Sequence, residues 1–296
     1  MISLRPPSGM ISYIVSRLDT LFRSLLFYLG QRRPQPMIFP KNFDLLHKGE
    51  EFIRSKSKEA IEKSDVLLHH LNVVADSMNL IDHFARTYPH QSDDQLVVQL
   101  LGIRLFNSMA GAVQDLMAGY YQNSVMQLRD ILEVGFLLDY FHTDNALIAD
   151  WKGCSESERN RRFSAFKVRT TLDERDGFTE KKRMGHYQLL CNLGGHASFQ
   201  GFELLRPMAG GDAHCGPYFA DRALDATLSE LAKVAVGAAG NFTMFFDPRG
   251  VPDFEAKLHF MEAHSAWFEK FFGRSLDVGQ IGRMRELLER AKAEKR

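Results

Sequence analysis

Apolar residues recur every three or four positions along most of this chain, which is the spacing of amphipathic helices. Residues 43–86 contain no proline and only one glycine, and their pattern predicts one long helix, or two with a break between 56 and 64. Ser92 and the two aspartates after it are typical of a helix N-cap with an acidic first turn. They predict a second helix over 95–121.

The next segment is apolar on most of its faces, so the helix predicted over 123–141 is expected at the centre of the fold. Arg129 and Glu133 are the charged exceptions within it. The same spacing predicts further helices over 146–151, 155–170, 178–193, 220–246, 253–272 and 278–295. Residues 202–219 differ, because a strand-like run there is followed by glycine and proline turn signals. The predicted fold class is therefore all-α, a multi-helix bundle with a small β-hairpin insertion near 202–219.

The N-terminal segment has its own amphipathic pattern, over residues 10–29. Its apolar runs are too short for a transmembrane span or for the core of a signal peptide. Three interpretations remain open: a helix docked on the main domain, a helix lying on a membrane surface, or sequence upstream of a native start at Met37. We accordingly divide the chain into an N-terminal segment with its linker, a single helical domain and a charged C-terminal helix, at 1–37, 38–275 and 276–296.

Composition narrows the class of protein. The chain has 296 residues, 45% of them hydrophobic, with 37 basic and 37 acidic side chains, which excludes a disordered tail. Three cysteines leave one unpaired in any disulfide scheme, which favours a reducing compartment and predicts a cytoplasmic protein. The sequence strings typical of dinucleotide, P-loop, serine-hydrolase and zinc-protease sites are absent, so we expect no cofactor and no metal.

Two stretches carry a resemblance to known proteins: 121–133, which reads YQNSVMQLRDILE, and 187–198, which reads YQLLCNLGGHAS and is followed by a Gly-Pro turn at Gly216. They resemble uncharacterised bacterial helical proteins grouped near the HEPN superfamily, over about 91–246. The resemblance implies that an Arg-x-x-x-Glu helix faces a later helix ending in histidine. Catalytic members of that superfamily cleave RNA without a metal, through Arg-x(4–6)-His motifs at a dimer interface. No histidine here has an arginine at that distance, and only Lys181-x4-His186 approaches the motif.

The candidate site residues follow from helical spacing. Arg129 and Glu133 are four residues apart and can pair, either in a pocket where Arg129 reaches an anion and Glu133 orients His196 or Tyr187, or as a half-buried structural ion pair. His186 and His196 are candidate catalytic groups, because imidazole donates and accepts protons near neutral pH. Lys181 is the third catalytic candidate.

A basic cluster supplies the candidate binding residues. Ten basic and six acidic residues lie within 152–183, and helical spacing places Arg159, Arg162 and Arg169 along one face. Arg183 shares a face with Tyr187. Such a cluster either contacts phosphates or forms a solvated face.

We therefore expect a helical binding protein in a HEPN-like setting that recognises RNA, a nucleotide or a protein partner, as a homodimer. One alternative is a metal-independent ribonuclease that uses His196 or His186. The other is a membrane-peripheral protein anchored by residues 10–29.

Overall fold

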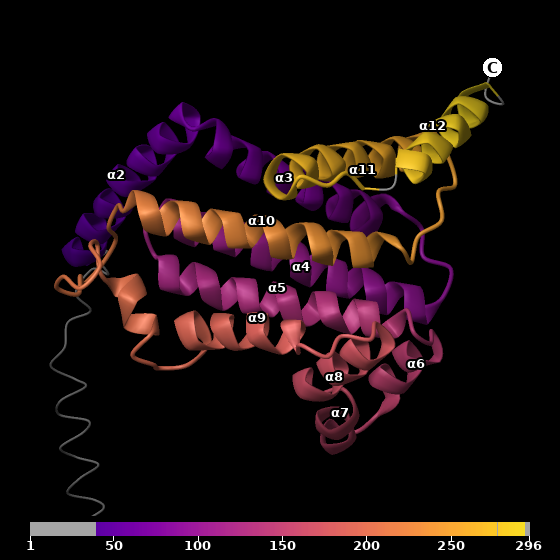
Figure 1. Ribbon diagram of the computed structural model, residues 1–296, viewed down its shortest axis with the longest axis horizontal. Coiled ribbons are helices and arrows are strands. Elements are labelled where there is room, and N and C mark those ends of the chain that lie inside the picture. Colours follow the sequence, from indigo (N-terminus) through magenta and orange to yellow (C-terminus); the bar gives the residue numbers. More distant parts are fainter. Residues whose placement is uncertain (1–39, 277, 294–296) are drawn as a thin grey trace, which may run out of the picture. The chain divides into compact units, whose positions relative to one another are not determined.

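The computed structural model describes residues 40–276 and 278–293, and the amphipathic pattern over 10–29 lies outside them. The chain divides into two compact units, 1–45 and 46–296, and the second contains most of the helical domain. The described residues of this second unit are all-α, as the spacing predicted, and include no strand. Figure 1 shows its helices stacked in layers.

The long helical pattern at the start of the domain is two helices. Helix α2 spans Lys41–Lys63 and helix α3 spans Asp65–Asp82. Ser64 separates them, because its side chain accepts a hydrogen bond of 3.3 Å from the Leu67 amide and caps α3. A π-helical turn, His83–Thr87, follows α3.

Two central helices carry most of the core. Helix α4 spans Asp93–Met117 and begins at the predicted cap, where Ser92 accepts from the Gln95 amide at 3.1 Å. Helix α5 spans Tyr121–Phe141 and packs against α4 on one side and against α10, Asp221–Thr243, on another. Its expected central position is confirmed: α8 and α9 cover a further side (Figure 1). Among the described helices, α4 is long and apolar enough to cross a membrane by length and composition, but it is also a packed core helix.

Four short helices follow α5: α6 at Ala146–Gly153, α7 at Glu156–Arg162, α8 at Ala165–Arg175 and α9 at Lys182–Leu190. The single helix predicted over 155–170 is wrong, because two serines each start a helix. Ser155 forms a capping box with Glu158, and Ser164 accepts from the Lys167 amide at 3.3 Å. Helix α9 continues into a π-helical turn, Cys191–Gly195.

The predicted β-hairpin near 202–219 is also wrong. Gly201–Leu205 is a 3₁₀ turn, and the residues after it to Ala220 are irregular. Tyr218, near the end of this segment, attaches to the core instead. Tyr218 donates to the Leu204 carbonyl at 2.6 Å, and its buried ring packs edge-on against Tyr121 with centroids 5.3 Å apart. One backbone bond, from the His214 amide to the Leu205 carbonyl, joins the two arms, which is too little for a strand ladder.

Helix α11, Val251–Phe272, packs on α3, and helix α12, Val278–Ala293, packs on α11. Leu258, Ile281 and Leu288 form a small apolar cluster between α11 and α12, separate from the main core. The last helix therefore depends on α11 for its position.

Candidate functional site

Three predicted residues meet between α5 and α9. Arg129 donates to Oε1 of Glu133 at 3.0 Å, and the Tyr187 hydroxyl donates to the same oxygen at 2.7 Å. Two glycines after α9 let this close approach happen. A Cβ at Gly194 would lie 2.8 Å from the Met126 amide nitrogen, and one at Gly195 would lie 3.1 Å from Cδ of Arg129. The expected pairing of Arg129 with Glu133 is therefore present, with Tyr187 as its third member.

Charge and burial set the proton affinities of this cluster. Burial lowers the pKa of Arg129, but its contacts with Glu133 and Tyr187 raise that pKa by more than burial lowers it. The net shift is therefore upward. Burial is the main cause that raises the pKa of Tyr187 to about 12, and the Glu133 carboxylate adds to it. Arg129 thus stays a cation and Tyr187 stays a neutral phenol at neutral pH.

Arg169 approaches the same cluster from α8. Its guanidinium lies over the Tyr187 ring, 3.7 Å from the centroid, and its Nη2 donates weakly to the Met184 sulfur at 3.6 Å. The side chain is only 4% exposed, and its Nε and Nη1 have no hydrogen-bond partner within the described residues. No carboxylate of this part of the chain pairs with it. Arg169 is therefore a buried cation without a counter-ion.

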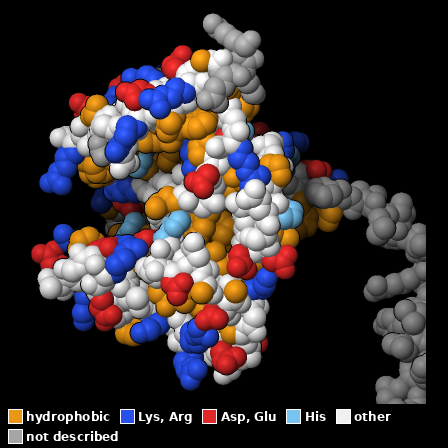
Figure 2. All heavy atoms as spheres, turned by 90° about the vertical axis from the view of Figure 1, so that its right-hand side faces the viewer, with side chains coloured by type: hydrophobic (Ala, Val, Ile, Leu, Met, Phe, Trp, Pro, Cys, Tyr) orange, Lys and Arg blue, Asp and Glu red, His pale blue; other side chains and the backbone are white. Residues whose placement is uncertain are grey.

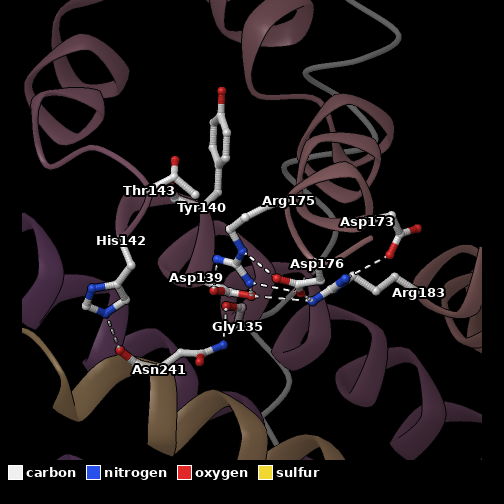
Figure 3. Close-up of polar contacts among 10 residues, drawn as sticks. All are labelled: Gly135, Asp139, Tyr140, His142, Thr143, Asp173, Arg175, Asp176, Arg183 and Asn241. Carbon is white, nitrogen blue, oxygen red and sulfur yellow. Dashed lines mark hydrogen bonds and ion pairs between the residues drawn. The ribbon is translucent and has the colours of Figure 1, made fainter. Parts of the chain in front are cut away.

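Arg183, in contrast, is fully neutralised by acidic residues. It donates to Asp173 at 2.8 Å and also to Asp176, while Arg175 donates to Asp139 and to Asp176 at 2.7 Å each (Figure 3). Hydrogen bonds from Arg175 and Arg183 lower the pKa of Asp176 to about 2, against a smaller effect of burial. These ion pairs fasten the ends of α8 and α9 to α5.

The other predicted arginines are likewise engaged. Arg159 donates to the Cys154 carbonyl at 3.3 Å and lies over the Trp151 ring, and Arg162 pairs with Asp150. The sequence grouped both with Arg169, but they belong to α7, and the break before α8 separates them from it. The predicted basic face is therefore not continuous.

His186 lines a groove of about 390 Å³ between α5, α9 and α10. Ile131, Leu132, Gly135, Phe136, Val234, Gly237 and Ala238 form its apolar lining, with Lys182, Arg183, His186, Lys233 and Asn241 as polar neighbours. Nε2 of His186 lies 3.1 Å from Glu230, which also accepts from Lys233 at 2.6 Å. Asn241 donates to the Gly135 carbonyl at 3.0 Å at one side of the groove (Figure 3).

Sequence reasoning missed Glu230. Burial raises the pKa of this carboxyl, but hydrogen bonds from His186 and Lys233 lower it more, to about 2. Glu230 thus remains an anion that fixes His186, an arrangement suited to general base chemistry. The only signal in the sequence was the i, i+3 pair of Glu230 with Lys233, which resembles any surface pair on a helix.

Lys181 and His186 do not line the same pocket. Lys181 precedes α9 in a left-handed conformation, with φ of 49°, and lines a second pocket of about 420 Å³ on the other side of the α9 N-terminus. That pocket is lined by Arg169, Met184 and the exposed rings of Phe166 and Phe178, and also by the acidic residues Asp173 and Glu174. The Lys181-x4-His186 spacing therefore does not form one site.

His196 lies outside the cluster as well. Its amide donates to the Cys191 carbonyl at 2.8 Å and ends the π-helical turn, but its imidazole is exposed and makes no hydrogen bond to any described residue. Glu133 hence orients Tyr187 and not His196. The described residues also contain no group of three or more His, Cys, Asp or Glu side chains placed to hold a metal ion.

Comparison with known proteins finds no matching family model, no matching curated protein and no matching solved structure. The protein is thus an all-helical bundle without a family assignment, and its site must be judged on its own geometry.

Proposed function

We propose that this protein binds single-stranded RNA across the N-terminus of α9. The observation that carries the proposal is Arg169, a buried guanidinium without a counter-ion. Arginine keeps its charge at any pH that proteins experience, and an unpaired buried charge is costly. A phosphate or a base edge in the adjoining pocket would supply the acceptors that its Nε and Nη groups lack.

The same pocket offers surfaces for bases. Phe166 is 61% exposed and Phe178 is 45% exposed, and both line it beside Arg169. Exposed aromatic rings next to cations are the usual platform for bases of a single strand, because every base has a face that can stack. Lys181 at the rim adds a charge for the backbone.

The groove on the other side of α9 extends this surface. Lys182, Lys233 and His186 line it, and no described carboxylate does, although Glu230 pairs with Lys233 and His186 beside it. The pair of Lys182 with Glu180, at 3.2 Å, is exposed and therefore weak, so Lys182 can turn to a phosphate. The volume of the groove suits a nucleotide-sized group. A HEPN-like role in RNA recognition agrees with this placement.

The test is binding of a fluorescently labelled single-stranded oligoribonucleotide, followed by anisotropy at several salt concentrations. We expect Arg169→Met and Phe166→Ala each to weaken binding about tenfold or more. Arg290→Ala, which removes an exposed charge on α12, is the matched control and should not change affinity at constant salt. Absence of binding by the unaltered protein, or equal affinity of Arg169→Met, contradicts the proposal.

A second function, metal-independent RNA cleavage, is favoured by one observation. Glu230 holds His186 in the groove, as a carboxylate holds a catalytic imidazole. The corresponding test is cleavage of the oligoribonucleotide in EDTA. If cleavage occurs, His186→Gln should abolish it and His196→Gln should not, because His196 lies apart from the groove. Loss of cleavage in His196→Gln alone would instead favour the other histidine.

We also propose that the protein forms a homodimer through α4 and α5. Leu100, Ile103 and Met126 are exposed apolar residues on the face these helices share. Light scattering after gel filtration should give a dimer mass that Leu100→Glu reduces to that of a monomer, whereas Leu45→Glu, another exposed leucine, should not.

Cytoplasmic location and membrane anchoring by residues 10–29 stay predictions, and vesicle flotation with and without 1–37 distinguishes them.

A further inference from the structure

A third cavity lies between α10, α11 and α12 and has a volume of about 670 Å³. Most of its lining is apolar: Met244, Phe260, Met261, Leu276, Ile281, Met284 and Leu287. Figure 2, which views the side where α12 lies, shows hydrophobic side chains gathered below the α11–α12 layer. Methionine is flexible and fits irregular apolar ligands.

Two polar residues of this cavity, Lys257 and Thr243, lie next to each other. Lys257 donates one hydrogen bond, to the Thr243 carbonyl at 2.9 Å, and its ammonium lies 5.5 Å from the centroid of the Phe84 ring. It forms no ion pair with any described carboxylate. Thr243 Oγ1 is buried without a hydrogen-bond partner, and Arg283 on α12 adds a second positive charge. Among the described residues, none that lines the cavity is an aspartate or a glutamate.

Burial lowers the pKa of Lys257, and the negative charges of Asp247 and Asp253 raise it by less. Neither aspartate lines the cavity. Desolvation of the ammonium is thus incompletely compensated in the protein alone. An anion beside it would restore that compensation, and the apolar lining limits the rest of the ligand to hydrocarbon.

We propose that this cavity binds a long-chain fatty acid. Its carboxylate accepts from Lys257 and from the Thr243 hydroxyl, and its chain lies along the methionine-rich wall. Charge complementarity selects the acid over a neutral lipid, since an ester or alcohol would leave the ammonium without a counter-ion. This site is independent of RNA binding.

Two glycines of α10 provide matched variants. A Cβ at Gly240 meets no atom within 4 Å, and the residue lines this cavity, while Gly237 is equally open and lines the groove beside His186. Neither has the positive φ that would strain a side chain. Gly240→Phe should therefore fill the fatty-acid cavity, and Gly237→Phe should fill the groove.

The experiment titrates the full-length protein with the fluorescent fatty acid cis-parinaric acid and displaces it with palmitate or methyl palmitate. We expect displacement by palmitate at least tenfold more effective than by its methyl ester. Lys257→Met should remove that preference, Lys257→Arg should retain it, and Gly240→Phe should abolish binding while Gly237→Phe does not. Far-ultraviolet circular dichroism of each variant establishes that it is folded. No binding, equal displacement by the ester, or unchanged binding by folded Gly240→Phe overturns the proposal.

Discussion

The Tyr187 hydroxyl donates to Oε1 of Glu133 at 2.7 Å, the same oxygen that accepts from Arg129, so one carboxylate joins α5 to α9. This shared acceptor explains why a charged pair is stable in an otherwise apolar helix. Each half-buried charge has its counter-charge within reach, and the phenol satisfies a remaining lone pair. The cluster holds α9 in the position where its N-terminal turn separates the two pockets.

Removing the phenol should weaken this link. We expect Tyr187→Phe to lower the free energy of unfolding by about 1–2 kcal/mol, because Glu133 loses a hydrogen bond. Urea unfolding at neutral pH measures the change. Tyr140→Phe is the control, since the Tyr140 hydroxyl makes no hydrogen bond within the described residues. An effect of Tyr187→Phe no larger than that of Tyr140→Phe would contradict the inferred role of the bond.

The same bond predicts a dependence on alkaline pH. The pKa of Tyr187 is raised from 10.0 to about 12, so the folded protein holds this proton longer than the unfolded chain does. The Tyr187 hydrogen bond therefore contributes its whole stabilisation below pH 10, and this contribution is lost as pH rises towards 12. The absorbance titration of phenolate should therefore lose one late-titrating tyrosine in Tyr187→Phe.

Glu230 predicts an acid-sensitive contact between α10 and α9. Its pKa falls from 4.5 to about 2, so the folded state stabilises the carboxylate. That contribution is present above pH 4.5 and is lost as pH falls towards 2. Glu230→Gln should cost about 1.5–3 kcal/mol at neutral pH, since the carboxylate that accepts these hydrogen bonds is charged.

Urea unfolding of wild type and Glu230→Gln across that pH interval checks this, and the two curves should converge in acid. Glu174→Gln, an exposed carboxyl without an ion pair among the described residues, should change stability little at any pH. A constant difference between wild type and Glu230→Gln would show that the carboxylate is not the source of the stability.

The helices were predictable because their signals are local. Apolar spacing and the caps at Ser64, Ser92 and Ser155 act within a few residues, and the structure follows them. The predicted hairpin failed for the opposite reason. Tyr218 packs in the core against Tyr121, which is nearly a hundred positions away in the sequence. Local secondary-structure propensity does not depend on such a distant contact.

The site was predictable only in part for the same physical reason. Arg129 and Glu133 are neighbours on one helix turn, so their pairing could be read directly. The ion pairs of the basic cluster could not be predicted, because Asp139 and Asp150, which neutralise Arg175 and Arg162, lie outside residues 152–183. Arg169 is buried without an acidic partner among the described residues, and the sequence around it does not reveal this.

Two glycines of α4 should respond oppositely to the same substitution. A Cβ at Gly102 would lie 2.4 Å from Cε2 of Phe242 on α10, whereas one at Gly111 would make an ordinary 3.6 Å contact with Gln127. Gly102→Ala should cost about 1–3 kcal/mol through overpacking. Gly111→Ala should stabilise by up to about 1 kcal/mol through helix propensity. Thermal unfolding compares them, and equal effects would mean that α4 and α10 are not packed this closely.

His264 should stay uncharged far below the pH at which histidine is usually protonated. Burial lowers its pKa from 6.5 to about 4, among the rings of Phe260, Trp267 and Phe268. Between pH 6.5 and 4 the histidine of the unfolded chain is protonated, whereas His264 of the folded protein is not. Stability therefore falls as pH drops from 6.5 towards 4. His264→Phe should reduce this slope, while Met261→Leu, which alters the same cavity without a titrating group, should not. A histidine proton resonance that titrates near 4 and disappears in His264→Phe would identify the residue, and its titration near 6.5 would refute the burial of this ring.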